Sequence, residues 1–402
     1  MLASLLPIRD RRERVIGYRV LSCPAAERRG RESPDGDVRR TVEMVASLAR
    51  LAGKSIVVPV TPGIVREGAL SRFASVDAVW LIATDAIDDA ATRKAVERML
   101  GAGFHFALEG YPDGEPLPAS LLGATIVLDA QRHTPTLLES RVRVLLEAGL
   151  RPLVRGVDDR AVRYRVLATG APLYTGRLLT RAASAPIDSD AEASVLRSIS
   201  MLAQFADGRP PNAAFDNFVR DDPHLAASML RSIRSASFGA RGPRSVEHAL
   251  ELLGRDAVME QLVRVTAHLI GEAAHDPELA LTALRRARMC ERVGAALDGA
   301  PHPRARTLAG LLSVLEFALG IPPAMIVERL QLPLVLQDAL MARREPLGQL
   351  LDVLDAMEYG WWEDLRARCG RLGIAPLVVG EASLAAWRAA REELGFARGD
   401  AS

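Results

Sequence analysis

The chain has 402 residues, which is enough for two or three domains, and its 49% hydrophobic content is sufficient to fill ordinary cores. Its 51 basic and 50 acidic side chains leave a formal net charge of +1, so no overall field directs it toward nucleic acid or a membrane, and neither is predicted as a partner. The cysteines, Cys23, Cys290 and Cys369, are too widely spaced for a disulfide framework or a zinc site, and since no signal peptide or membrane span is recognised, we expect a cytoplasmic protein.

The predicted elements begin with a pair of strands joined by a charged turn. An apolar run ending at Ile8 leads into the turn, residues 9–14, and a second apolar run follows from Val15 to Leu21. From there to about residue 181, short apolar strands alternate with helical segments. The further strands are predicted over residues 55–60, 76–83, 104–109, 124–129, 151–157 and 173–179, and the helices over residues 38–51, 90–100, 137–146 and 160–168. This alternation predicts a parallel sheet, and the opening pair of strands favours a modified (β/α) barrel.

The second half of the chain is predicted to be entirely helical. Residues 182–190 are small and polar and are interrupted by Pro186, which is typical of a linker between domains. Beyond them, apolar residues recur at helical spacing, and one such stripe consists of Val258, Leu262, Val265 and Leu269. We therefore expect a multidomain α and β protein, with a barrel domain over residues 1–181 and an all-helical domain over residues 191–402.

The opening segment resembles the start of the EAL domains, which are barrel enzymes that hydrolyse the bacterial messenger cyclic di-GMP. The family's PI-x-D segment corresponds to residues 7–10, and its G-Y-E-x-L-x-R motif corresponds to residues 17–23. The resemblance implies a two-metal phosphodiesterase site at the C-terminal ends of the barrel strands.

The EAL positions that bind metal or phosphate are largely changed in this chain. Arg19 stands where the family has a metal-binding Glu, Cys23 where it has a phosphate-binding Arg, and Pro59 where it has an Asn. Arg155 lies in a strand that carries a Glu in the family. A guanidinium group about 5 Å from a divalent ion is repelled by roughly 6 kcal/mol at an effective dielectric near 20. These replacements predict a site that repels divalent cations.

Three acidic positions of the family remain, at Glu109, Asp129 and Asp158. They are too few for two divalent cations, so we expect no metal, no other cofactor and no enzymatic activity. A receptor that binds cyclic di-GMP or a related nucleotide without hydrolysing it is the alternative function. The candidate ligand-binding residues of such a receptor are Asp129, Arg155, Gly176 and Arg177.

Residues 221–254 resemble the signature of the HDOD domain, a helical domain related in fold to the HD phosphohydrolases. The family pattern is D-P-x-L, followed by N-S-A-x-x-G and by S-x-x-x-A-x-x-x-L-G. The matching positions are Asp222, Pro223, Leu225, Ser235, Ala236, Gly239, Ser245, Ala249, Leu253 and Gly254, and Arg234 replaces the Asn. Together the two resemblances make the chain similar to proteins in which a shortened, degenerate EAL domain is fused to an HDOD domain.

The dipeptide His275-Asp276 could suggest an HD-type metal site. Asp276 is followed by Pro277, however, and this combination is typical of a helix N-cap. The other histidines show no matching ligand spacing, so we favour the N-cap. The tandem Trp361-Trp362 is equally compatible with a partner-binding anchor and with a place in the core.

The function predicted from the sequence is that of a non-catalytic bacterial signalling adaptor. Both domain frames keep their packing residues while the expected metal ligands are lost, and a fold carries chemistry only through its site residues. The expected partners are other signalling proteins, whose identity is not predicted, and the sequence predicts no oligomeric state.

Overall fold

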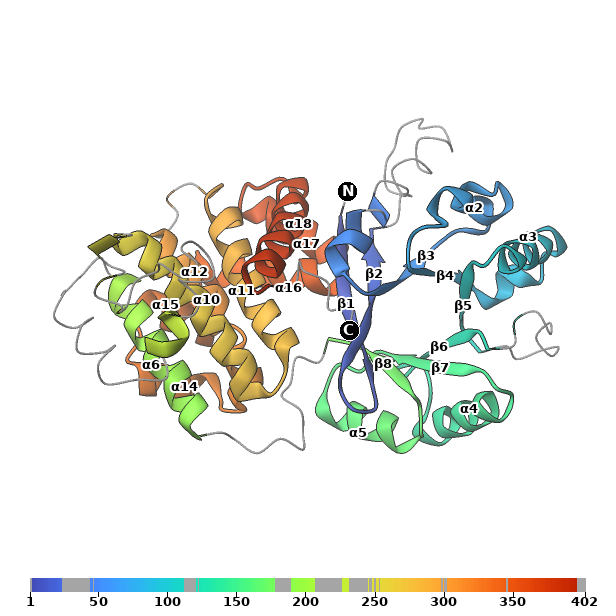
Figure 1. Cartoon of the computed structure of the whole chain (residues 1–402), viewed down its shortest axis with the longest axis horizontal. Helices are drawn as coiled ribbons and strands as arrows, with labels where there is room; N and C mark the ends of the chain where they lie inside the picture. Colours follow the sequence, from blue (N-terminus) through green and yellow to red (C-terminus); the bar gives the residue numbers. More distant parts are fainter. Residues whose placement is uncertain are drawn as a thin grey trace. The chain divides into compact units, whose positions relative to one another are not determined.

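The computed structural model describes residues 2–23, 44–45, 47–111, 121, 123–177, 189–206, 226–230, 245, 248, 251–252, 254–297, 299, 302–344 and 346–395. The chain divides into two compact units. The barrel unit comprises Met1–Leu178 and Glu358–Gly360, and the helical unit comprises Leu179–Met357 and Trp361–Ser402. Figure 1 shows the strands of the barrel unit in blue to green, and every element described in the helical unit is a helix.

The barrel unit is a closed barrel of eight strands in which each strand pairs with the next one along the chain. β1 (Ala3–Asp10) and β2 (Val15–Ser22) form an antiparallel hairpin, and β8 (Leu173–Thr175) pairs antiparallel with β1 to close the barrel. All other pairs of neighbouring strands, from β2–β3 to β7–β8, are parallel. The strands between β2 and β8 are β3 (Ser55–Pro59), β4 (Ala78–Ala83), β5 (His105–Glu109), β6 (Thr125–Asp129) and β7 (Arg151–Arg155). The prediction of a modified barrel is confirmed.

The turn of the opening hairpin is organised by Asp10. Its Oδ1 accepts the backbone N–H groups of Arg12, at 2.9 Å, and of Arg14, at 3.0 Å, while its Oδ2 accepts the Arg14 guanidinium. Glu13 takes the left-handed conformation, with φ of 63°, that such a tight turn requires. Burial acts to raise the pKa of Asp10, but the hydrogen bonds from Arg14 and Arg12 outweigh it and lower the pKa. The charged turn seen in the sequence is therefore closed by its own side chains.

Apolar side chains on alternate strand positions fill the interior of the barrel. This interior layer consists of Ile8, Val57, Leu81, Ala107, Val127, Leu153 and Leu173. Residues that face the other way, such as Trp80 and Ile126, are also buried. Strands buried on both faces are continuous apolar runs in the sequence, which explains why β3 to β7 could be predicted within two residues of their observed ends.

The helices of the barrel unit begin at N-caps that the sequence supplies. They are α2 (Pro62–Arg66), α3 (Ala90–Gly101), α4 (Pro135–Glu147) and α5 (Arg160–Ala168), with the 3₁₀ helices η2 (Ala69–Phe73) and η3 (Thr84–Ile87). The caps are Thr61, Asp89, Thr134 and Asp159, and each accepts the backbone N–H three residues further on. The sequence predicted α3, α4 and α5. It missed α2 and the 3₁₀ helices, which are too short to show a helical period.

The helical unit is built around α11 (Pro277–Gly294), nearly all of whose side chains are buried. It packs against α10 (Arg255–Ala274), α12 (Pro303–Leu312) and α18 (Pro376–Glu393), and α6 (Ser189–Ala206) packs against α10 and α12. Further helices with described bounds are α13 (Leu315–Leu319), α14 (Pro323–Leu330), α15 (Leu334–Met341), α16 (Leu347–Tyr359) and α17 (Trp362–Arg371). The stripe predicted on α10, at Val258, Leu262, Val265 and Leu269, is buried as expected.

Most of the HDOD signature lies outside the described residues. Asp222, Pro223, Leu225, Ser235, Ala236, Gly239, Ala249 and Leu253 are in this group. Gly254 is described, and it precedes α10 with a left-handed φ of 77°, which a glycine adopts readily. The predicted linker, residues 182–190, also lies mostly outside, and its last two residues, Ser189 and Asp190, already belong to α6.

Within the described ranges, no single helix is long and apolar enough to cross a membrane. Two pairs of consecutive helices, each bent at the break between its members, reach that length and apolar composition only when both helices are taken together. The first pair is residues 303–319 with α14, and the second is α17 with α18. In the first pair, Gly320 ends α13 with φ of 71° and Pro323 begins α14.

Candidate functional site

Four charged side chains meet in the barrel, three of them from the ends of strands and one from within a strand. Glu109, Asp129 and Arg155 are the last residues of the neighbouring strands β5, β6 and β7. Arg19 comes from β2, where it pairs in register with Val57, a residue of the interior layer, so its side chain also points into the barrel. We call these four residues the mouth cluster.

Ion pairs connect all members of the mouth cluster. Glu109 Oε1 lies 3.1 Å from Nη2 of Arg19 and 2.9 Å from Nη1 of Arg155. The other terminal nitrogen of Arg155, Nη2, lies 2.9 Å from Oδ2 of Asp129. Arg19 therefore reaches across the barrel from β2 to β5, and Arg155 bridges two carboxylates.

Local hydrogen bonds fix the acidic members of the cluster. Asp129 Oδ1 accepts the backbone N–H of Gln131 at 2.9 Å, which leaves Oδ2 for Arg155. The hydroxyl of Thr84 donates to the backbone carbonyls of Glu109 (3.1 Å) and Gly110 (2.9 Å) at the end of β5. The first contact holds the Asp129 carboxylate toward Arg155, and the other two fix the backbone from which the Glu109 side chain projects.

Arg19 is the most buried member, since only 12% of its side chain is exposed. Burial lowers the pKa of Arg19, the charge of Arg155 acts in the same direction, and attraction to Glu109 and Asp129 opposes them. Its Nε is buried without a hydrogen-bond partner among the described residues. The ion pair with Glu109 is therefore the main contact that stabilises a positive charge at this depth.

The mouth cluster does not fit the pair of divalent cations that the EAL resemblance implies. Each carboxylate is already engaged by a guanidinium group 2.9 to 3.1 Å away, and a cation placed between them would be repelled by both arginines. In the described part of the chain, no group of three or more His, Cys, Asp or Glu side chains could hold a metal ion.

The other predicted ligand residues, Gly176 and Arg177, lie outside the mouth cluster. Arg177 forms a separate pair with Asp158, in which Nη2 lies 2.5 Å from Oδ2 and the Arg177 backbone N–H donates to Oδ1 at 2.9 Å. Gly176 is required for packing, because a Cβ at this position would lie 2.1 Å from the backbone oxygen of Val157. Of the four candidates, only Asp129 and Arg155 belong to the mouth cluster.

Substitution of Asp158 should make the barrel unit less stable at neutral pH. Burial acts to raise the pKa of Asp158, but the hydrogen bonds and charge of Arg177 outweigh it, and the pKa is lowered from its ordinary 3.8. When the pKa of a carboxyl group is lower in the folded state than in the unfolded state, its ionisation stabilises the fold at pH values above the unfolded-state pKa. This stabilisation is lost as the pH falls through the folded-state pKa.

We expect Asp158→Asn to cost about 1 kcal/mol at pH 7 and progressively less below pH 4. Urea unfolding at pH 7 and at pH 3 measures the difference, and Asp85→Asn, at an exposed carboxylate, is the control. An equal cost at both pH values would count against this assignment.

Sequence reasoning identified Arg19 and Glu109 but did not include them in the ligand-binding set. Their side chains are 90 positions apart in the sequence, and no local spacing predicts that pairing. A usable signal was available, because barrel closure places the ends of all parallel strands at one mouth. Glu109, the last residue of β5, could have been added on that ground, whereas Arg19 lies within β2 rather than at its end.

The dipeptide His275-Asp276 is the helix start predicted from the sequence. Asp276 Oδ1 accepts the backbone N–H of Glu278 at 3.0 Å, and Pro277 is the first residue of α11. His275 ends α10 in the left-handed conformation, with φ of 53°. The N-cap interpretation is confirmed.

No cysteine of the chain is in a disulfide bond. Cys290 and Cys369 are buried, and burial raises the pKa of the Cys369 thiol to about 11. Cys23, which stands at the phosphate-binding position of the EAL motif, is half-buried. Trp361 is 41% exposed and Trp362 is half-buried, so neither is a core residue.

Comparisons with known proteins find one family model, one curated relative and several solved structures that are similar to this chain. The family model of the HDOD domain matches residues 195–316. Among curated proteins, the cyclic di-GMP phosphodiesterase CdgJ of Vibrio cholerae is 28% identical over 159 residues, which is 39% of this chain and 37% of that protein. The chain thus matches well under half the length of this curated relative.

Solved structures similar to this chain include proteins crystallised with cyclic di-GMP. BlrP1 of Klebsiella pneumoniae, in a complex with calcium and cyclic di-GMP, has a TM-score of 0.38 and 18% identity, covering 45% of this chain and 55% of that one. The FimX EAL domain of Pseudomonas aeruginosa, bound to cyclic di-GMP, has a TM-score of 0.34 and 16% identity, covering 44% of this chain and 89% of that one.

The predicted HDOD domain is confirmed by the family match, and the barrel precedes this domain in the chain as predicted. The prediction that the chain is not an enzyme is contradicted, because the curated relative is named a cyclic di-GMP phosphodiesterase. The error came from equating the loss of individual EAL ligand positions with the loss of activity.

Proposed function

We propose that this chain, whose barrel is followed by an HDOD domain over residues 195–316, is a cyclic di-GMP signalling protein. In this proposal the barrel binds the dinucleotide at the mouth cluster, and the helical unit transmits the signal by contact with other proteins. The observation that supports it best is the pair of guanidinium groups, from Arg19 and Arg155, held at the mouth of the barrel.

The chemistry of the mouth cluster suits a ligand with phosphodiester groups. A guanidinium group presents a planar set of N–H donors that matches two phosphate oxygens, and it cannot lose its proton at physiological pH. Arg155 is 25% exposed, and Arg132, whose Nε lies 3.7 Å from Asp129, is 78% exposed. With Arg132, the cluster has three guanidinium groups and two carboxylates, which leaves one positive charge for the ligand.

The carboxylates have a second use in this proposal. Glu109 and Asp129 hold Arg19 and Arg155 in place without a ligand, so the donors are preorganised. Carboxylate oxygens also accept hydrogen bonds from nucleobase N–H groups, which a guanine base carries on its Watson–Crick edge. One cluster can therefore engage both the phosphates and the bases of the same ligand.

Isothermal titration of the full chain with cyclic di-GMP tests the proposal. We expect Arg155→Met to weaken binding about tenfold to a hundredfold, because a hydrogen bond to a charged group contributes about 1.5–3 kcal/mol. Arg151→Met is the matched control, since Arg151 is exposed at the opposite end of β7.

An absence of binding by the unsubstituted chain, or an equal loss in the two variants, would overturn the proposal. Circular dichroism melts check that both variants are folded. Chromatography of the recovered nucleotide, with and without added divalent metal, determines whether the dinucleotide is hydrolysed.

A further inference from the structure

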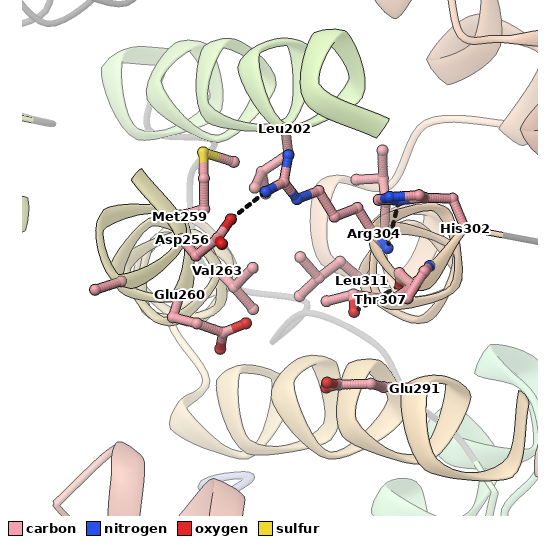
Figure 2. A pocket seen from close by; sticks show the side chains of 13 residues that line it. Leu202, Asp256, Met259, Glu260, Val263, Glu291, His302, Arg304, Thr307 and Leu311 are labelled. Atoms are coloured by element: carbon pink, nitrogen blue, oxygen red, sulfur yellow. Dashed lines mark hydrogen bonds and ion pairs between the residues drawn. The ribbon is translucent and has the colours of Figure 1, made fainter. Parts of the chain in front are cut away.

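A cavity of about 410 Å³ lies within the helical unit, surrounded by α6, α10, α11 and α12 (Figure 2). Its volume falls in the range of sites that bind small organic molecules, roughly 300 to 1,000 Å³. The cavity is separate from the mouth cluster, and it has no role in the function proposed above.

The floor of the cavity is apolar. Leu202, Met259, Val263 and Leu311 line it from three different helices, and each of these side chains is buried. Figure 2 shows the Met259 and Val263 side chains on α10 and Leu311 on α12, turned toward the same space. An apolar ligand body placed there would be removed from water without displacing a charged group.

The rim of the cavity has more negative than positive charge. Asp256 and Arg304 form an ion pair across it, so their charges offset each other. Glu260 and Glu291 share Arg288: Glu260 Oε2 lies 2.6 Å from Nη2, and Glu291 Oε2 lies 3.1 Å from Nη1.

Arg288 forms ion pairs with three carboxylates, so its single positive charge does not neutralise them. Its Nη2 also lies 2.8 Å from Glu393, whose other basic neighbour, Arg264, is 3.8 Å away. Burial acts to lower the pKa of Arg288, but the hydrogen bonds and charges of Glu393 and Glu260 outweigh it and raise the pKa. When Glu393, Arg264 and Arg288, which do not line the cavity, are counted with the lining residues Asp256, Glu260, Glu291 and Arg304, four carboxylates face three guanidinium groups.

Two carboxylate oxygens remain available at the rim. Arg288 engages Oε2 of Glu260 and Oε2 of Glu291, while Oε1 of each accepts no hydrogen bond in the described part of the chain. Their side chains are 50% and 40% exposed. A cation entering the cavity could therefore reach both groups without breaking the existing ion pairs.

We propose that this cavity binds an organic cation with an apolar body, such as an alkylammonium or alkylguanidinium compound. The apolar body rests on Leu202, Met259 and Val263. The cationic head group donates to the free oxygens of Glu260 and Glu291. His302 at the rim does not bind this cation through Nδ1, because that atom already accepts the backbone N–H of Arg304 at 3.3 Å and helps to cap α12.

Methyl NMR of the full chain, labelled with ¹³C at the methionine methyl groups, tests this proposal directly. The probes are n-hexylammonium, hexan-1-ol and hexanoate, which share one apolar body and differ in charge. Met259 reports on the site because its side chain lines the cavity, and its resonance is assigned with Met259→Leu. We expect hexylammonium to shift this resonance saturably, with an affinity about threefold to fivefold above that of hexanol, and hexanoate to bind most weakly.

Substitution of the rim carboxylates should remove the preference for the cation. In Glu260→Gln/Glu291→Gln, we expect hexylammonium and hexanol to bind equally, while Glu251→Gln, at an exposed position outside the cavity, keeps the preference. Thermal melts confirm that the variants are folded. The proposal is overturned if no probe shifts Met259, if hexanol binds the unsubstituted chain as well as hexylammonium does, or if hexanoate is preferred.

Discussion

Replacement of Gly310 with alanine should destabilise the helical unit by about 3 kcal/mol, the upper end of what overpacking a core costs. Gly310 lies on α12 where this helix crosses α11. A Cβ at this position would lie 2.6 Å from the backbone N and Cα of Ala287 and 2.6 Å from the carbonyl carbon of Arg286. Backbone atoms cannot turn aside as a side chain can, so the two helices would have to separate.

The chain offers a matched control for this substitution. Gly370 also lies in a helix, α17, but it is exposed, and a Cβ there would meet no atom within 4 Å. Gly370→Ala should leave the stability unchanged or increase it by up to about 1 kcal/mol, because alanine favours the helix over glycine. Urea unfolding followed by circular dichroism at 222 nm compares the variants. A Gly310→Ala chain as stable as the unsubstituted chain would mean that α11 and α12 do not pack as closely as described.

Removal of the carboxylate of Asp355 should have a comparable or larger effect, about 3–5 kcal/mol. Arg286 on α11 is 2% exposed at its side chain; its Nη2 lies 2.7 Å from Asp355 Oδ1, and its Nη1 donates to the Ser313 hydroxyl at 3.1 Å. Asp355→Ala removes this carboxylate from the buried guanidinium group, so less of the desolvation cost of its charge is offset.

Two further variants separate this explanation from a general loss of packing. Arg286→Met/Asp355→Leu removes both charges and should recover most of the lost stability, because an apolar pair of similar volume can replace a buried ion pair. Asp338→Ala removes an exposed partner of Arg344, 3.5 Å away, and should cost less than about 1 kcal/mol. If the double variant is no more stable than Asp355→Ala, the loss of the ion pair between Arg286 and Asp355 is not the cause.

The fold was largely predictable from local sequence patterns. The strands of the barrel were found because their apolar runs end at glycine, proline or charged residues, and the opening hairpin was found because Asp10 and its arginines mark a turn. The stripe on α10, at Val258, Leu262, Val265 and Leu269, follows from the helical period. The 3₁₀ helices and α2 were missed because five residues or fewer show no period.

The candidate site was predictable only in part. Asp129 and Arg155 follow from their place at strand ends, but the pairing of Arg19 with Glu109 across the barrel depends on closure and leaves no trace in local spacing. Gly176 stays a predicted ligand-binding residue, and its close approach to Val157 adds a packing role that only coordinates reveal. The cavity of the helical unit was not foreseen, because its lining residues come from helices up to about a hundred positions apart in the sequence.

The most direct test of the central claim, that Arg19 and Arg155 hold the phosphate groups of a cyclic dinucleotide, is the ³¹P NMR spectrum of cyclic di-GMP titrated with the full chain in the absence of added divalent metal. The account predicts that the phosphate resonance shifts or broadens with the unsubstituted chain and with Arg151→Met, and that it keeps its free position with Arg19→Met/Arg155→Met. A resonance that the unsubstituted chain leaves unchanged, or that the double variant perturbs to the same extent, would contradict it.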